Sequence, residues 1–197
     1  MIEIMKLFMQ VVLIALSSIS LSGCFGTVMT GVGMVYDRHN IYKKISDFQL
    51  AANVRRALYK DSLLKCKTCY IDVESFNRDL LLAGHVPNRG LRDEAERRVK
   101  SVEGYRRVFV HLGINKQRAP AIEDSWITAK IRSGILADSS INPKKFRVAT
   151  SDGVVYLMGD VDPKQARKVI QIARTTSGVK RVVKMFRYYH LTNKQKD

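Results

Sequence analysis

The residues best suited to a specific contact lie at positions 124–137, a stretch that carries the chain's only tryptophan, Trp126. Apolar residues recur there with the period of a helix that begins on a capping Asp or Ser. One side of this helix carries the isoleucines Ile127, Ile131 and Ile135, as an ordinary core stripe would. Roughly opposite lies a second stripe made of Trp126, Ala129, Ser133, Leu136 and Ala137. An indole and a leucine on the side away from the core predict contact with an apolar partner.

Two cations, Lys130 and Arg132, border this second stripe. Cations beside exposed apolar side chains are typical of a helix that lies on a membrane surface. A simpler interpretation is that Trp126 closes the edge of the core, since single exposed apolar residues are common. The candidate membrane-contact residues are Trp126, Leu136, Lys130, Arg132, Ser133 and Ala129.

Composition limits the classes of protein to consider. The 197 residues are 46% hydrophobic and 26% charged, which suffices for one large folded domain or two small ones. The formal net charge of +16 predicts attraction to a polyanion: nucleic acid, an anionic membrane face or an acidic protein. Charge alone does not choose among them.

The N-terminus has the features of an export signal. Lys6 precedes an uncharged apolar run over residues 7–19, too short to span a bilayer but suited to a secretory signal. Residues 21–24 (Leu-Ser-Gly-Cys) match the bacterial lipobox, in which the signal is cut before the cysteine and its thiol is acylated with diacylglycerol. We therefore expect a signal peptide at 1–23, a lipid anchor on Cys24 and a linker up to residue 46. The alternative is an unlipidated apolar N-terminus with a chance cysteine.

The anchor decides the compartment. Phe25 follows Cys24, where an Asp would resemble an inner-membrane retention signal, so we expect the outer membrane and its periplasmic face. An exported protein does not normally meet nucleic acid. The positive charge then indicates membrane lipid, cell-wall polymer or other envelope proteins as partners.

The rest of the chain contains two copies of one unit. With a shift of 77 residues, Asp47, Leu50, Val54, Arg55 and Leu58 align with Asp124, Ile127, Ile131, Arg132 and Ile135. Each copy predicts the order helix, strand, strand, helix, strand: 47–60, 70–76, 79–86, 91–102 and 105–112, then 124–137, 145–150, 154–161, a helix opening at 162–163, and 179–189. Because a helix joins the last two strands, they should be parallel neighbours in a mixed three-stranded sheet under two helices. The fold class is α+β, with domains at 47–118 and 119–191 and a tail at 192–197.

The copies differ at two places. Arg78 stands where the second copy has Gly153, so we expect the first hairpin turn to be built differently. The outer face of the first helix carries Gln49, Ala52, Arg56 and Tyr59 and lacks an indole. The predicted membrane contact therefore belongs to the second copy.

Residues 153–161 (Gly-Val-Val-Tyr-Leu-Met-Gly-Asp-Val) and 177–182 (Ser-Gly-Val-Lys-Arg-Val) resemble the core of the BON domain. Two such units behind a lipobox are similar to dual-BON outer-membrane lipoproteins. The resemblance implies that the second unit binds anionic phospholipid, of the phosphatidylglycerol or cardiolipin type, through its first helix. It further implies a role in outer-membrane integrity, at division sites, with envelope assembly or division proteins as partners.

The remaining residues that could carry out chemistry do not form a catalytic motif. Cys66 and Cys69 form a C-x-x-C that in an oxidising compartment predicts a disulfide, with free thiols or a redox pair as alternatives. No zinc spacing, nucleophile motif or phosphate loop is found, so we expect neither a metal, a cofactor nor an enzyme. The competing function is a scaffold that binds envelope proteins or peptidoglycan without recognising lipid directly.

Overall fold

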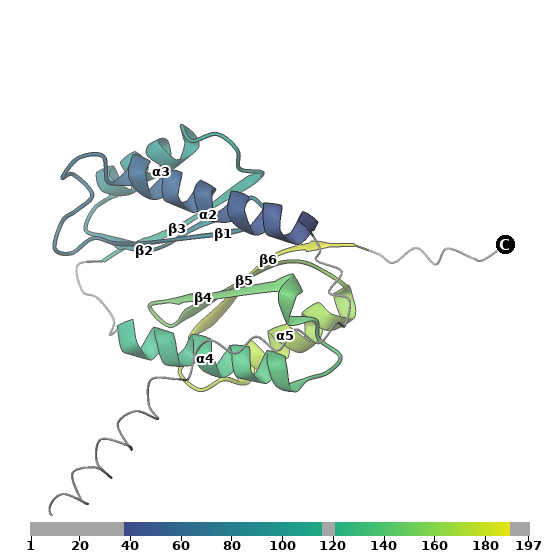
Figure 1. Ribbon diagram of the computed structural model, residues 1–197. Coiled ribbons are helices and arrows are strands. Elements are labelled where there is room, and N and C mark those ends of the chain that lie inside the picture. The colour runs from purple at the N-terminus through teal and green to yellow at the C-terminus, as the bar shows by residue number, and fades with distance from the viewer. Residues whose placement is uncertain (1–37, 116–120, 190–197) are drawn as a thin grey trace, which may run out of the picture. The chain divides into compact units, whose positions relative to one another are not determined.

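The computed structural model describes residues 38–115 and 121–189, which belong to one compact unit (Figure 1). Cys24, the signal peptide, residues 24–37 and the tail from residue 190 lie outside the described residues. The first domain contains α2 (Arg38–Leu58), β1 (Tyr70–Phe76), β2 (Asp79–Val86), α3 (Arg89–Lys100) and β3 (Arg107–Ile114). The second contains α4 (Ala121–Ala137), the short 3-10 helix η1 (Pro143–Lys145), β4 (Phe146–Ser151), β5 (Val154–Val161), α5 (Pro163–Thr175) and β6 (Arg181–Tyr188). Within the described ranges no helix is both long and apolar enough to cross a bilayer.

Each domain has the predicted α+β topology. β2 pairs antiparallel with β1 and parallel with β3, and β5 does the same with β4 and β6. The middle strand of each sheet therefore continues through a helix to a parallel neighbour, as the order of elements required. The prediction of two small mixed sheets, each with two helices, is confirmed.

The first helix of each domain begins earlier than predicted. α2 starts at Arg38, inside the stretch expected to be a linker, and α4 starts at Ala121 rather than Asp124. The helix was expected to begin on a capping Asp or Ser, but the Asp124 carboxylate instead accepts the backbone N–H groups of Asp152 and Gly153, both at 2.8 Å. Asp124, a residue type common at helix N-caps, thus links the helix to the hairpin between β4 and β5.

The two hairpin turns have the same backbone form, so the expectation for Arg78 was wrong. Asn77 and Arg78 have φ values of 50° and 64°, and Asp152 and Gly153 have 53° and 75°. Positive φ at both central positions is the type I′ pattern, which costs a non-glycine residue about 1–2 kcal/mol. Asp47 offsets this cost because its carboxylate accepts both turn N–H groups at 2.7 Å.

Hydrophobic residues of each domain form a separate core between its helices and its sheet. In the first domain it includes Val54, Leu58, Leu80, Leu82 and Val99. In the second it includes Ile131, Ile135, Leu157, Val169 and Ala173. A third cluster takes alternate residues from the other face of both sheets: Leu81, Ala83, Ala149, Tyr156, Met158 and Met185. Among the described residues, all three clusters lie within positions 50–185.

Candidate functional site

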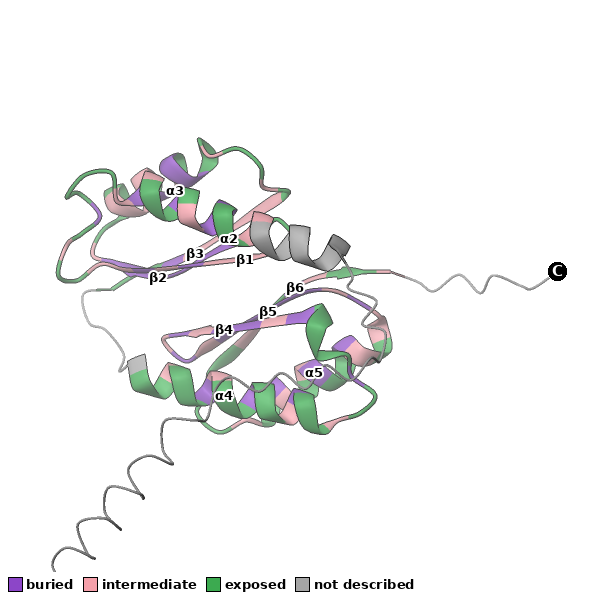
Figure 2. Ribbon diagram, viewed as in Figure 1, coloured by how far each residue is buried: buried purple, intermediate pink, exposed green. Residues whose placement is uncertain are grey.

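Helix α4 has a buried face and an exposed face. Ile127, Ile131 and Ile135 are at most 4% exposed and pack in the core of the second domain. Residues one helical turn apart share a face, so the opposite side of α4 is left to the solvent along its length (Figure 2).

The exposed face carries large apolar side chains. Trp126 is 65% exposed and Leu136 is 68% exposed. Ala129 and Ser133 are also exposed and lie between them on the same stripe. Trp126 does not close the edge of the core, so the simpler interpretation of this residue does not hold.

Ile122 belongs to the same stripe and was missed from the sequence. It is 67% exposed and lies four residues before Trp126, which places both on one side of the helix. The omission followed from starting the helix at Asp124. The signal was present, because the spacing of Ile122, Trp126, Ala129, Ser133 and Leu136 is helical throughout.

Lys130 and Arg132 flank the stripe, and each donates a hydrogen bond to a backbone carbonyl. The Lys130 ammonium donates to the Ser177 carbonyl at 2.9 Å, and Arg132 Nη2 donates to the Val148 carbonyl at 2.9 Å. Neither side chain has a carboxylate partner among the described residues. Each cation is therefore held in place by a backbone carbonyl, which does not offset its charge as a carboxylate would.

The negative charge of Asp138, the residue that follows α4, is paired with a lysine of the same domain. Hydrogen bonds from Ser140 and then from Lys168 lower the pKa of Asp138 to about 2. Its carboxylate lies 3.0 Å from the Lys168 ammonium. The carboxylate that directly follows α4 is therefore already paired with Lys168.

The matching helix of the first domain presents a different surface. Gln49 and Arg56 are exposed where the second domain has Trp126 and Ser133. Tyr59, at the position of Leu136, is half-buried, and its hydroxyl donates to the Ile71 carbonyl at 3.1 Å. Burial, followed by the nearby charge of Asp72, raises the pKa of Tyr59. The apolar stripe is therefore a property of α4 and not of the repeated fold.

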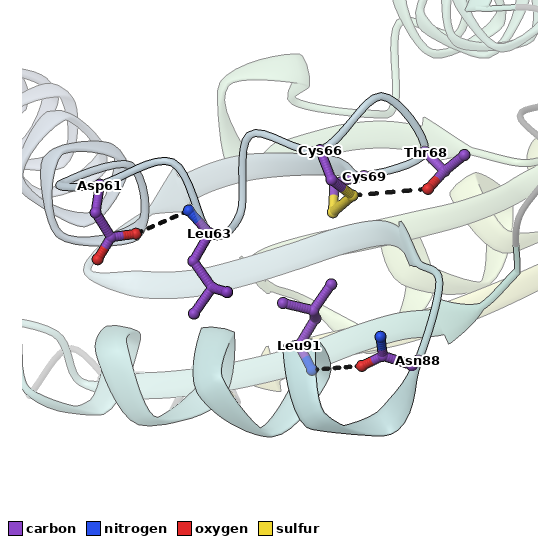
Figure 3. The surroundings of a disulfide bond; sticks show 7 residues. All are labelled: Asp61, Leu63, Cys66, Thr68, Cys69, Asn88 and Leu91. Carbon is purple, nitrogen blue, oxygen red and sulfur yellow. Dashed lines mark hydrogen bonds between the residues drawn. A yellow bond between two sulfur atoms is a disulfide. The ribbon is translucent and has the colours of Figure 1, made fainter.

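Cys66 and Cys69 are joined by a disulfide with an S–S distance of 2.09 Å (Figure 3). They lie in the loop between α2 and β1, in the first domain, and so take no part in the α4 surface. The Thr68 hydroxyl lies 3.6 Å from the Cys66 sulfur, and the nearby Asp61 carboxylate accepts the N–H of Leu63 at 3.0 Å. Each of these bonds joins residues no more than three positions apart, so they stabilise the loop locally.

The two repeated domains, each a three-stranded mixed sheet with two helices, are BON domains, and the chain belongs to the BON-domain family. The family model matches residues 46–114 and 123–188. The chain is 32% identical to the outer membrane lipoprotein DolP of Haemophilus influenzae, over 87% of this chain and 92% of that protein. It is 31% identical to a 21 kDa hemolysin of Actinobacillus pleuropneumoniae, over 74% of this chain and 75% of that protein. It is 29% identical to the osmotically-inducible protein Y of Escherichia coli, over 70% of each.

Proposed function

We propose that this protein is a periplasm-facing lipoprotein of the outer membrane that binds anionic phospholipid through the exposed face of α4. The observation that carries the proposal is the stripe formed by Ile122, Trp126 and Leu136, which exposes about two thirds of each side chain. Next to it lie two cations, Lys130 and Arg132, that have no carboxylate partner in the part of the chain that the structure describes. Nothing within the domain requires large apolar groups there. In a bilayer interface they would leave water, and the cations would meet lipid phosphates.

The energetics favour a lipid surface with negative charge. Burial of apolar area contributes about 25 cal/mol per Å², and each Lys or Arg near an anionic surface contributes about 1 kcal/mol. Either contribution alone gives weak, reversible binding. Together with an acyl anchor on Cys24, they would hold the second domain against the membrane that the anchor already occupies.

The location is supported by the export signal of the sequence and by similarity to DolP, which is named as an outer membrane lipoprotein. Lipid recognition by α4 would let the protein gather where anionic phospholipid is enriched, including at division sites, and so support the integrity of the outer membrane. Envelope assembly or division proteins are the partners that such a location allows.

The test is vesicle binding by the fragment that contains residues 38–197. Flotation with vesicles of increasing phosphatidylglycerol content, at two salt concentrations, should show binding that rises with anionic lipid and falls with salt. Binding to neutral vesicles to the same extent, or no binding at any composition, would refute the proposal. Binding to a peptidoglycan or protein fraction that does not change when Trp126 is removed would favour the scaffold function instead.

A further inference from the structure

A small cavity of about 230 Å³ lies beside the exposed end of α4, wholly within the second domain. Three elements line it: α4, η1 and β4, through Arg132, Ile135, Leu136, Pro143, Phe146 and Val148. Its floor is core, since Ile135, Phe146 and Val148 are at most 8% exposed, whereas Leu136 stands at its rim. Sites for whole drug-sized ligands measure about 300–1,000 Å³, so this cavity suits part of an elongated apolar molecule.

A positively charged side chain, Arg132, lies at the rim of the cavity and is fixed by a hydrogen bond. Arg132 Nη2 is held by the Val148 carbonyl at 2.9 Å, and this is the only hydrogen bond of that side chain within the described residues. The remaining N–H groups of the guanidinium are available for an acceptor, and a phosphate fits their planar fork. Arg147 also borders the cavity, but Glu74 already takes two of its N–H groups.

In the first domain, a tyrosine side chain covers the position that corresponds to this cavity. Arg55 donates to the Val73 carbonyl at 2.6 Å, as Arg132 does to Val148, so the two arginines are equivalent. Where Leu136 leaves the cavity open, Tyr59 packs on the first core and bonds the Ile71 carbonyl.

The charge of one residue beside the cavity also differs between the two domains. The position of Arg147 in the second domain is occupied by Asp72 in the first, which would repel an anion. The two departures, a missing tyrosine lid and a reversed charge, occur at one place and both favour an anionic amphiphile in the second domain only.

We infer that this cavity takes a segment of one acyl chain of an anionic phospholipid, with the lipid phosphate against Arg132. The inference rests on the proposed function and deepens it, because it adds a site for a single lipid molecule to the surface contact made by Trp126. An apolar floor, an apolar rim and a fixed cation at the entrance match the order of chain and headgroup in such a lipid.

The experiment separates single-lipid binding from adsorption to a surface. The probe is dihexanoyl phosphatidylglycerol below its critical micelle concentration, titrated into residues 38–197 and followed by calorimetry and by the methyl NMR signals of Val148. Dihexanoyl phosphatidylcholine serves as the neutral probe. The anionic probe should bind and shift the Val148 signals, and the neutral probe should bind about tenfold more weakly.

Two variants and their controls locate the site. Leu136→Tyr copies the tyrosine of the first domain and should weaken binding of the anionic probe about tenfold. Gln171→Tyr adds the same ring on the exposed side of α5, away from the stripe and the cavity, and should leave probe binding unchanged. Arg132→Gln should weaken probe binding, whereas Arg89→Gln, with the same loss of charge in α3, should not.

The outcomes distinguish the two ideas. If wild-type protein adsorbs to anionic vesicles but the monomeric probe does not bind or does not move Val148, the cavity inference fails and the surface contact stands. Unchanged probe binding by Leu136→Tyr, with its folding verified by circular dichroism, would also overturn it. If the probe binds as expected while vesicles do not, the surface contact fails and the cavity stands.

Discussion

Replacing Trp126 with alanine should weaken binding to anionic vesicles about 30-fold while leaving the fold intact. A tryptophan side chain offers about 150–250 Å² of surface. With 65% of it exposed, about 150 Å² is open to the bilayer, and its complete transfer would contribute about 4 kcal/mol. Immersion of about half that area gives about 2 kcal/mol, which corresponds to the stated factor. Because the ring packs little on the core, the free energy of unfolding should change by less than about 0.5 kcal/mol.

The assay is co-sedimentation with vesicles over a range of lipid concentration, beside urea unfolding of the same proteins. The matched control is Phe48→Ala, which removes another exposed aromatic ring, 74% exposed, from α2 in the first domain. That control should bind as wild type does. Equal binding by Trp126→Ala, or an equal loss in Phe48→Ala, would refute the assignment of the contact to α4.

Three further predictions concern stability. Asp124→Ala leaves two turn N–H groups without their acceptor and should lower the free energy of unfolding by about 1–3 kcal/mol in urea titrations; an unchanged midpoint would contradict the role of this carboxylate. Cys66→Ser opens a very small loop and should cost at most about 2 kcal/mol without altering vesicle binding. Burial raises the pKa of Asp79, but hydrogen bonds from Arg106 and Arg107 outweigh it, so the net pKa is lowered. That stabilisation is present above the unfolded pKa of about 4 and is lost as pH falls through the folded value. Asp79→Asn should therefore be less stable at neutral pH and should lose less stability on acidification below about pH 4, as urea unfolding over a pH series would show.

Much of the fold could be predicted because its signals are local. The apolar runs of β2 and β5, the Asp162 cap and the glycine near the end of α5 each act within a few residues. The internal repeat gave further evidence, because elements with a weak sequence pattern in the first copy align with elements that have a clear pattern in the second. The start of α4 was misplaced because Asp124 has the chemistry of a cap yet bonds a turn 28 residues away.

Contacts between distant positions gave no signal in the sequence. His85, which is 1% exposed, has its Nδ1 atom 2.8 Å from the carboxylate of Asp152 in the other copy. The same holds for Arg147 and Glu74, 73 residues apart. These pairs depend on which faces of the two sheets pack together, and residue spacing does not specify that. Helical periodicity placed Trp126 on the side away from the isoleucine stripe but left open whether the indole closes the edge of the core, and its 65% exposure decides between the two.

The most direct test uses Trp126 itself, because it is the chain's only tryptophan and its fluorescence reports on no other residue. On addition of phosphatidylglycerol vesicles to residues 38–197, its emission should shift to shorter wavelength and become protected from an aqueous quencher, and neutral vesicles should produce neither change. Emission that stays unshifted and fully quenchable at lipid concentrations where flotation shows the protein bound would contradict the account.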